Sequence, residues 1–305
     1  MTPTRTTTTV SRESAHTARE EAAKISVARL SMLAAGFLIL LKTATGFLTG
    51  SISVWASLID SAMDIFASAI NLVAVRAAAR PADEDHAYGH GKAESLAGLF
   101  QSLVIAASGA FLIYEAIRRL VEPHATSQEW IGIMTMLVAI IVSVALVRRL
   151  RRVARETESL ALASDAIHYA SDIFTNSGAL LALLIVVLTG WQMADPLISI
   201  MIAIYILWSA AAVGREAMDV LMDRRLPIDI DERIAAVINR YREQGVLGFH
   251  DLRTRRSGSQ KFIDLHLEVE RDKRLEEAHD LTVQVLRAIE ADIPRSRVHI
   301  HTDPG

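Results

Sequence analysis

The sequence predicts an α-helical membrane protein with six transmembrane helices, followed by a small cytoplasmic α/β domain. Hydrophobic residues make up 51% of the 305 residues, and the mean hydropathy is +0.29, both high for a soluble chain of this length. Six apolar segments approach the ~20 residues that a helix needs to cross a ~30 Å hydrocarbon core. From about Pro227 onward the chain is instead charged, with ordinary amphipathic patterning.

The apolar segments are taken in chain order, after a polar, Thr-rich stretch at residues 1–24 that lacks the features of a cleavable signal peptide. They are Ile25–Leu48, Ile52–Val75, Leu96–Ile117, Trp130–Val147, Ala161–Leu188 and Pro196–Val213. The fourth contains no charged residue, which argues against a large soluble helical protein. We therefore expect a polar tail at 1–24, a six-helix transmembrane domain at 25–218 and a C-terminal domain at 219–305.

The placement of Lys and Arg predicts the orientation in the membrane, because cytoplasmic connections are enriched in these residues. The connections after the first and fifth segments carry none, whereas basic residues follow the second and fourth. These are Arg76, Arg80 and Lys92, and then Arg148, Arg149, Arg151, Arg152 and Arg155. Arg118 and Arg119, at the end of the third segment, are the exception. The balance places both termini in the cytoplasm, with the chain in the inner (plasma) membrane.

The C-terminal domain is predicted to follow a helix–strand–strand–helix–strand order. Asp229–Gln244 has helical periodicity, with an apolar stripe formed by Ile230, Ile234, Val237, Ile238 and Tyr241. Two strands, joined by a turn at Ser257–Gly258, are followed by a second amphipathic helix and a last strand. Their expected bounds are Val246–Arg255, Lys261–Glu270, Leu275–Ala291 and Arg297–Thr302. This order suggests one sheet with both helices on one face.

Composition excludes several kinds of chemistry. The chain has no cysteine, so thiolate metal sites and cysteine nucleophiles are absent, and any metal must be bound by His, Asp or Glu. A net charge of −3 gives no reason to expect nucleic acid as a partner. The stretch Gly89-His-Gly91-Lys92 superficially resembles a phosphate-binding loop, but Ala93 stands where Ser or Thr is needed. Nothing therefore indicates ATP-driven pumping.

Two pairs of metal-ligand residues lie inside apolar segments. Asp60 and Asp64 fall in the second segment and His168 and Asp172 in the fifth, each pair spaced i, i+4 on one helix face. Each Asp costs roughly 2.5–3.5 kcal/mol at the centre of a spanning helix. The alternative is that the four are structural polar groups bonded across helices. Two pairs made entirely of ligand types favour a tetrahedral site for a divalent transition metal.

A second cluster lies in the polar connection before the third segment. His86 and His90 are spaced i, i+4, and Asp83 lies three residues upstream of His86. A connection rich in Asp and His can bind a metal, and it can equally be a solvated turn. Composition alone does not decide between the two.

A third cluster lies in the C-terminal domain, which holds five of the ten histidines. Period-two alternation places His299, His301 and Asp303 on one face of the last strand. In the middle strand, Asp264 and His266 face opposite to the apolar residues. The whole cluster comprises His250, Asp264, His266, His279, His299, His301 and Asp303. Because the strands bring these side chains together, metal binding is favoured over scattered surface histidines.

These motifs together resemble the cation diffusion facilitator family, of the bacterial zinc and ferrous-iron efflux type. The resemblance runs from about Ile25 to Pro304. The matching stretches are Asp60-Ser-Ala-Met-Asp64, His86-Ala-Tyr-Gly-His-Gly-Lys-Ala-Glu-Ser95, His168-Tyr-Ala-Ser-Asp172, His250-Asp-Leu-Arg-Thr-Arg255 and His301-Thr-Asp-Pro304. The paired motifs within apolar segments are highly specific.

The resemblance implies a homodimer with six transmembrane helices per subunit and a cytoplasmic domain of metallochaperone-like fold. It also implies a set of sites. The transport site would be Asp60, Asp64, His168 and Asp172, the loop site Asp83, His86 and His90, and the binuclear cytoplasmic site His250, His266, His301 and Asp303, with His279 bridging or peripheral. A charge interlock between subunits would fall on Lys92 and Asp223. Thr302 and His299 depart from the family pattern, which affects the ligand details of the cytoplasmic site.

The function expected is secondary transport, exporting divalent cations from the cytoplasm in exchange for protons. Zn²⁺ suits the mixed nitrogen and oxygen ligands best, and Cd²⁺ or Fe²⁺ are also compatible. The alternatives are a membrane-embedded metalloenzyme, a metal sensor without transport, and a cation channel. No His-Glu-x-x-His motif is present, and a quartet filling every tetrahedral position leaves no place for a catalytic water. Four strong ligands would also trap an ion in a channel.

Overall fold

The computed structural model describes residues 6–49, 53–121 and 130–305, and within them the side-chain surroundings of residues 18–45, 64–121, 130–131 and 133–305. The chain divides into two compact units, Met1–Met218 and Asp219–Gly305. Each unit is described by itself.

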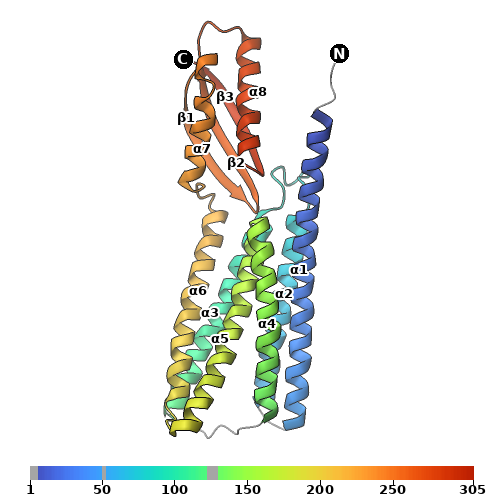
Figure 1. Cartoon of the computed structure of the whole chain (residues 1–305), viewed down its shortest axis with the longest axis vertical. Helices are drawn as coiled ribbons and strands as arrows, with labels where there is room; N and C mark the ends of the chain where they lie inside the picture. The colour runs from blue at the N-terminus through green and yellow to red at the C-terminus, as the bar shows by residue number, and fades with distance from the viewer. Residues whose placement is uncertain (1–5, 50–52, 122–129) are drawn as a thin grey trace. The chain divides into compact units, whose positions relative to one another are not determined.

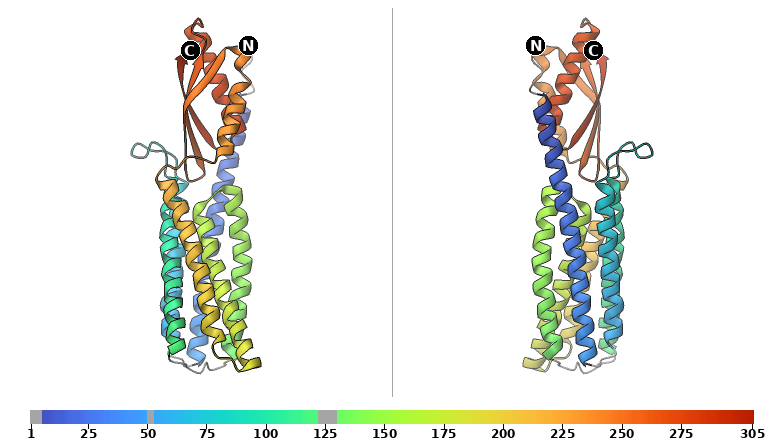
Figure 2. Two further views of the ribbon diagram at one scale, coloured as in Figure 1. Left: turned by 90° about the vertical axis from the view of Figure 1, so that its left-hand side faces the viewer. Right: turned by 90° about the vertical axis from the view of Figure 1, so that its right-hand side faces the viewer.

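The first unit is a bundle of long helices that run alongside one another (Figures 1 and 2). Neighbouring pairs include α4 with α5, α1 with both α2 and α4, and α3 with both α2 and α5. The helices are α1 (Thr6–Thr49), α2 (Ser53–Ala78), α3 (Lys92–Val121), α4 (Trp130–Thr157), α5 (Leu160–Thr189) and α6 (Ala194–Leu221).

Five of these helices are long and apolar enough to cross a membrane, counted over the described residues alone. The spans are Ala18–Thr45, Lys92–Val121, Ile133–Thr157, Leu160–Thr189 and Ala194–Leu221. The remaining predicted span, Ile52–Val75, corresponds to α2. The side chains of its first half, up to residue 63, lie outside the described part. The remainder is too short to cross a bilayer alone.

The bundle has small residues inside and large apolar residues outside. Buried positions include many alanines, such as Ala28, Ala161 and Ala203, which let helices approach closely. Leu33 and Trp208 are 71% and 69% exposed. Such exposure is costly in water and favourable in hydrocarbon, which agrees with a membrane environment.

Two helices extend beyond their predicted apolar segments. Helix α1 begins at Thr6, inside the stretch expected to be a polar tail, and α4 continues through Arg155 to Thr157. The expectation that the arginines after the fourth segment lie in a connection is therefore wrong. Arg, Glu, Lys and Ala all favour helix, so these polar stretches continue the helix past the apolar part. Helix α5 then begins directly after Ser159, whose hydroxyl caps it by accepting from the Leu162 N–H.

The second unit is a three-stranded sheet with α7 and α8 on one face (Figure 2). The strand order is β1-β2-β3, with β1 antiparallel and β3 parallel to β2. Ile263, Leu265 and Leu267 alternate along β2 and share one buried cluster with α7 and α8 residues. The elements are α7 (Ile228–Asn239), the short helix η1 (Arg242–Gln244), β1 (Val246–Ser257), β2 (Gln260–Val269), α8 (Leu275–Asp292) and β3 (Ser296–Pro304). The predicted α/β domain is thus confirmed.

Candidate metal centres

Helices α2 and α5 bring three of the four intramembrane ligand candidates together. Asp64, His168 and Asp172 each offer a ligand atom, and these atoms lie within 4.8 Å of one another. The His168 Nε2 atom is 3.1 Å from Asp64 Oδ1. His168 is buried and both carboxylates are half-buried. Asp60 lies one turn earlier on α2, and its side chain is outside the described residues.

Tyr169 fixes the part of α5 that carries His168. Its hydroxyl donates to the Ser31 carbonyl oxygen of α1 at 3.1 Å, and it lies 3.2 Å from the Ser68 hydroxyl of α2. Three helices therefore meet one residue away from the imidazole. A ligand on a helix tied to its neighbours in this way is held in place before the metal arrives, which favours binding.

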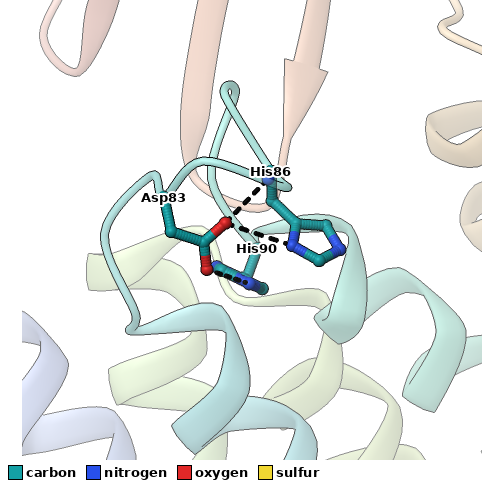
Figure 3. A group of neighbouring side chains, drawn as sticks. All are labelled: Asp83, His86 and His90. Atoms are coloured by element: carbon teal, nitrogen blue, oxygen red, sulfur yellow. Dashed lines mark hydrogen bonds and ion pairs between the residues drawn. The ribbon is translucent and has the colours of Figure 1, made fainter.

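The loop cluster is held by a tight turn (Figure 3). Asp83 Oδ1 accepts from the His86 backbone N–H at 2.7 Å and lies 3.2 Å from His86 Nδ1, while Oδ2 lies 3.3 Å from His90 Nε2. The His86 N–H holds the pKa of the Asp83 carboxyl below its ordinary value, with a further contribution from the two imidazoles. One ligand atom from each residue lies within 4.8 Å of the others. The geometry is thus compatible with a metal site open to water.

The sheet face opposite the helices gathers the cluster of the C-terminal unit. Asp303 lies at its centre, with Oδ2 2.8 Å from His266 Nδ1 and 3.3 Å from His250 Nε2. Its Oδ1 lies 3.3 Å from His301 Nε2. The strand register explains the convergence, since His266 is paired with His250 on β1 and with His301 on β3. The hydrogen bond to His266 lowers the pKa of the Asp303 carboxyl.

Three other predicted residues lie apart from this centre. His279 is on the exposed surface of α8, which covers the other face of the sheet. The Thr302 hydroxyl lies 2.8 Å from that of Thr282 on α8, so its side chain also faces the helices. His299 is exposed, with Nδ1 4.0 Å from Asp264. Within the described residues, His250, His266 and Asp303 each offer a ligand atom within 4.8 Å of the others, and His301 lies beside Asp303.

The two residues expected to form a charge interlock lie in different units. Lys92 begins α3 in the first unit. Asp223 lies in the second unit with a positive φ of 57°, and its carboxylate is 3.5 Å from Arg255. The interlock stays a prediction.

Comparison with known proteins decides the family. The cation efflux transmembrane domain matches residues 28–222, and the cytoplasmic domain of cation efflux proteins matches residues 226–305. The chain belongs to the cation efflux family. It is 43% identical over 282 residues to the cation-efflux pump FieF of Klebsiella pneumoniae, with 92% of each chain covered. It is 44% identical over 270 residues to FieF of Escherichia fergusonii, covering 88% of this chain and 89% of the relative.

Among solved structures, CzrB in its zinc form is 38% identical, with a TM-score of 0.26, covering 27% of this chain and 92% of that chain. As a member of the cation efflux family, the protein is a multi-pass membrane protein that exports divalent metal cations. The predicted family is therefore confirmed.

Sequence reasoning missed a buried ion pair in this cation efflux protein. The Lys24 ammonium on α1 donates to Glu94 Oε1 on α3 at 3.1 Å and to Glu21 at 2.9 Å. The Ser159 hydroxyl, which also caps α5, donates to the other oxygen of Glu94. The side chains of Lys24 and Glu94 are 3% and 1% exposed. Lys24 was read as the end of a polar tail, so only the tertiary structure reveals the pair.

A further buried carboxyl group lies one turn before His168. Asp165 is 1% exposed, and neither of its oxygens has a hydrogen bond of ordinary geometry within the described part of the chain. The Ser31 hydroxyl and the Asn71 amide are among the polar groups beside it. Its position inside the fifth apolar segment could have identified it from the sequence. An acidic residue within a spanning helix is costly, and such residues usually have a functional role.

Proposed function

We propose that this protein exports Zn²⁺ from the cytoplasm in exchange for protons, and that Asp60, Asp64, His168 and Asp172 form the transport site. The observation that carries the proposal is the meeting of Asp64, His168 and Asp172 between α2 and α5, with ligand atoms within 4.8 Å of one another. Asp60, one turn from Asp64, would complete a tetrahedron. One imidazole with carboxylates suits Zn²⁺ and Cd²⁺ and also accommodates Fe²⁺.

Exchange for protons follows from the chemistry of these ligands. Metal binding needs a neutral imidazole and ionised carboxylates, so protons and metal compete for the same atoms. An imidazole with an ordinary pKa of about 6.5 changes its protonation near neutral pH. Protons that enter from the outer side would displace the metal there, and the inward proton gradient would drive export.

The complete protein would be a homodimer with six spans per subunit in the inner membrane and both termini in the cytoplasm. Arginines at the C-terminal end of α4 support this orientation. Metal at the cluster around Asp303 would favour the transport-competent state through differential affinity. Lys92 and Asp223 would interlock the subunits, and the loop site of Asp83, His86 and His90 would bind metal near the entrance.

Flux measurements in proteoliposomes test this function. With Zn²⁺ outside and an acidic lumen, we expect zinc uptake to be faster than without a pH gradient, because zinc entry is coupled to proton exit. Uptake should fall to the basal rate when an ionophore collapses the gradient. Cd²⁺ and Fe²⁺ should compete for uptake, whereas Mg²⁺ should not, because it prefers an octahedral set of oxygens. Zinc flux indifferent to the gradient would contradict exchange. Metal binding without any flux would favour a metal sensor instead.

The Asp303 carboxylate of the cluster in the C-terminal unit should keep its charge over the neutral and mildly acidic range. Because the folded pKa of Asp303 is lowered, the stability contributed by its ionised form is present above the ordinary carboxyl value of about 3.9 and is lost as pH falls through the lower folded value. Between pH 7.5 and 5.5 this carboxylate therefore stays charged. Any loss of zinc affinity over that range would therefore come from groups other than the Asp303 carboxyl, because metal ligands must be deprotonated to bind.

The matched variants for this prediction are Asp303→Asn and Asp264→Asn. Equilibrium dialysis of the full chain should show that Asp303→Asn lowers zinc affinity by at least the roughly 10–100-fold that loss of a supporting group costs, with an unchanged pH slope, since a direct ligand is lost. Asp264, exposed on the same face but away from the centre, should leave the affinity as it is. A pH slope that changed with Asp303→Asn would show that this carboxyl group titrates in the window.

A further inference from the structure

An apolar groove lies along α1 in the first unit, and Arg149 is the one described lining residue that comes from α4. Helices α1 and α4 pack side by side (Figures 1 and 2). Its volume is about 640 Å³. Ile25, Leu30 and Leu33 of α1 form much of its wall, and Arg29 and Arg149 line the same groove from the two helices. No proposed metal ligand lies in it, so its role is separate from transport.

The two arginines lie near the same end of the apolar parts of their helices, where a long side chain can reach the headgroup level. Helix α4 is uncharged from Trp130 to Val147, and Arg149 comes two residues later. On α1, which runs antiparallel to α4, Arg29 lies near the N-terminal end of the apolar segment Ile25–Leu48. Arginines at this depth stand at the level of lipid headgroups. The groove therefore offers guanidinium groups at headgroup level and aliphatic side chains below them.

Both guanidinium groups are available for a ligand. Arg29 and Arg149 are exposed, and neither meets a carboxylate in the described part of the chain. Four further exposed arginines occupy the same end of α4, namely Arg148, Arg151, Arg152 and Arg155. A guanidinium fork matches the oxygens of a phosphate in a bidentate manner. The positive charge of this surface suits an anion, and the apolar wall beside it suits a hydrocarbon chain on the same ligand.

We propose that the groove along α1 binds an anionic phospholipid, whose phosphate lies between Arg29 and Arg149 and whose acyl chain lies along Leu30 and Leu33. Basic pockets between transmembrane helices recognise lipid headgroups in this manner. A free phosphate ion would use the arginines alone and leave the apolar wall without function. A zwitterionic lipid would use the wall but gain less from the two charges.

The test is native mass spectrometry of the purified full chain, equilibrated with equal amounts of phosphatidylglycerol and phosphatidylcholine. We expect the native protein to retain phosphatidylglycerol at least fivefold over phosphatidylcholine. Arg29→Gln/Arg149→Gln should lower that ratio to about one. The matched control is Arg271→Gln/Arg287→Gln, which removes the same charge from exposed positions of the second unit and should retain the native ratio.

Three outcomes would overturn the proposal. Equal retention of both lipids by the native chain would show an apolar groove without headgroup recognition. An unchanged ratio in Arg29→Gln/Arg149→Gln would place the lipid elsewhere. Complete displacement of phosphatidylglycerol by millimolar glycerol phosphate would indicate a site for free phosphate. Because the comparison of lipids on the native chain needs no variant, the proposal stays testable if the double variant is poorly expressed.

Discussion

Asp64→Asn is expected to reduce zinc transport by roughly two orders of magnitude or more. The substitution keeps the size of the side chain and removes the negative charge that lies 3.1 Å from the His168 imidazole. Loss of groups that merely support metal ligands already costs about 10–100-fold, and a charged ligand contacts the cation directly. Initial rates of zinc uptake into proteoliposomes measure the effect, alongside zinc binding by the same purified protein.

The matched control for this variant is Thr175→Ala on α5. The Thr175 hydroxyl donates to the Ser171 carbonyl oxygen within the same helix, so its loss should leave transport within about twofold of the native rate. Both variants should elute as the native oligomer. If Asp64→Asn transported zinc at the native rate, the site between α2 and α5 would not be the transport site.

Glu94→Ala is expected to lower the free energy of unfolding by about 3–5 kcal/mol, because it leaves the Lys24 ammonium buried without its main counter-charge. It also removes the acceptor of the Ser159 hydroxyl, which caps the helix carrying His168. Lys24→Met/Glu94→Gln should recover part of that loss, since it removes both charges of the buried pair and leaves only the half-buried Glu21 without Lys24. Unfolding of the full chain in detergent, followed by circular dichroism, measures all three proteins.

An exposed ion pair provides the control for the buried one. Lys273 and Glu270 lie 3.5 Å apart, and Glu270 is about half exposed. Glu270→Ala should therefore change the free energy of unfolding by less than about 1 kcal/mol. If Glu94→Ala cost as little as Glu270→Ala, the buried pair would contribute nothing to holding α1, α3 and α5 together.

The C-terminal unit was the part most fully predicted from the sequence. Alternation of Ile263, Leu265 and Leu267 with polar residues identified β2 and both of its faces, and the structure agrees. The same period-two pattern anticipated that His266 and Asp303 would share a face. The alternation also accounts for Thr302. It lies between His301 and Asp303 in the strand, so its side chain points to the opposite face, toward α8.

Helix limits in the first unit were predicted less well. Hydropathy marks where a helix leaves hydrocarbon, but it does not mark where the helix ends. Helix α4 continues to Thr157 through Arg, Ala and Glu, which favour helix in water. Helix α1 begins at Thr6, before the stretch around Ala18–Lys24 in which the same residue types recur. The arginines thought to lie in a connection are therefore on a helix, and this placement creates the groove that contains Arg149.

The sequence by itself determined the apolar segments, the i, i+4 pairing of Asp60 with Asp64 and of His168 with Asp172, and the face on which each strand residue lies. These features depend on local periodicity, which chain geometry fixes within a few residues. Only the tertiary structure decided that Asp64 meets His168, that Lys24 is buried against Glu94, and that Arg29 and Arg149 share one groove. Residues far apart in the chain meet only through the packing of helix against helix, and periodicity states which face is apolar without stating which neighbour covers it.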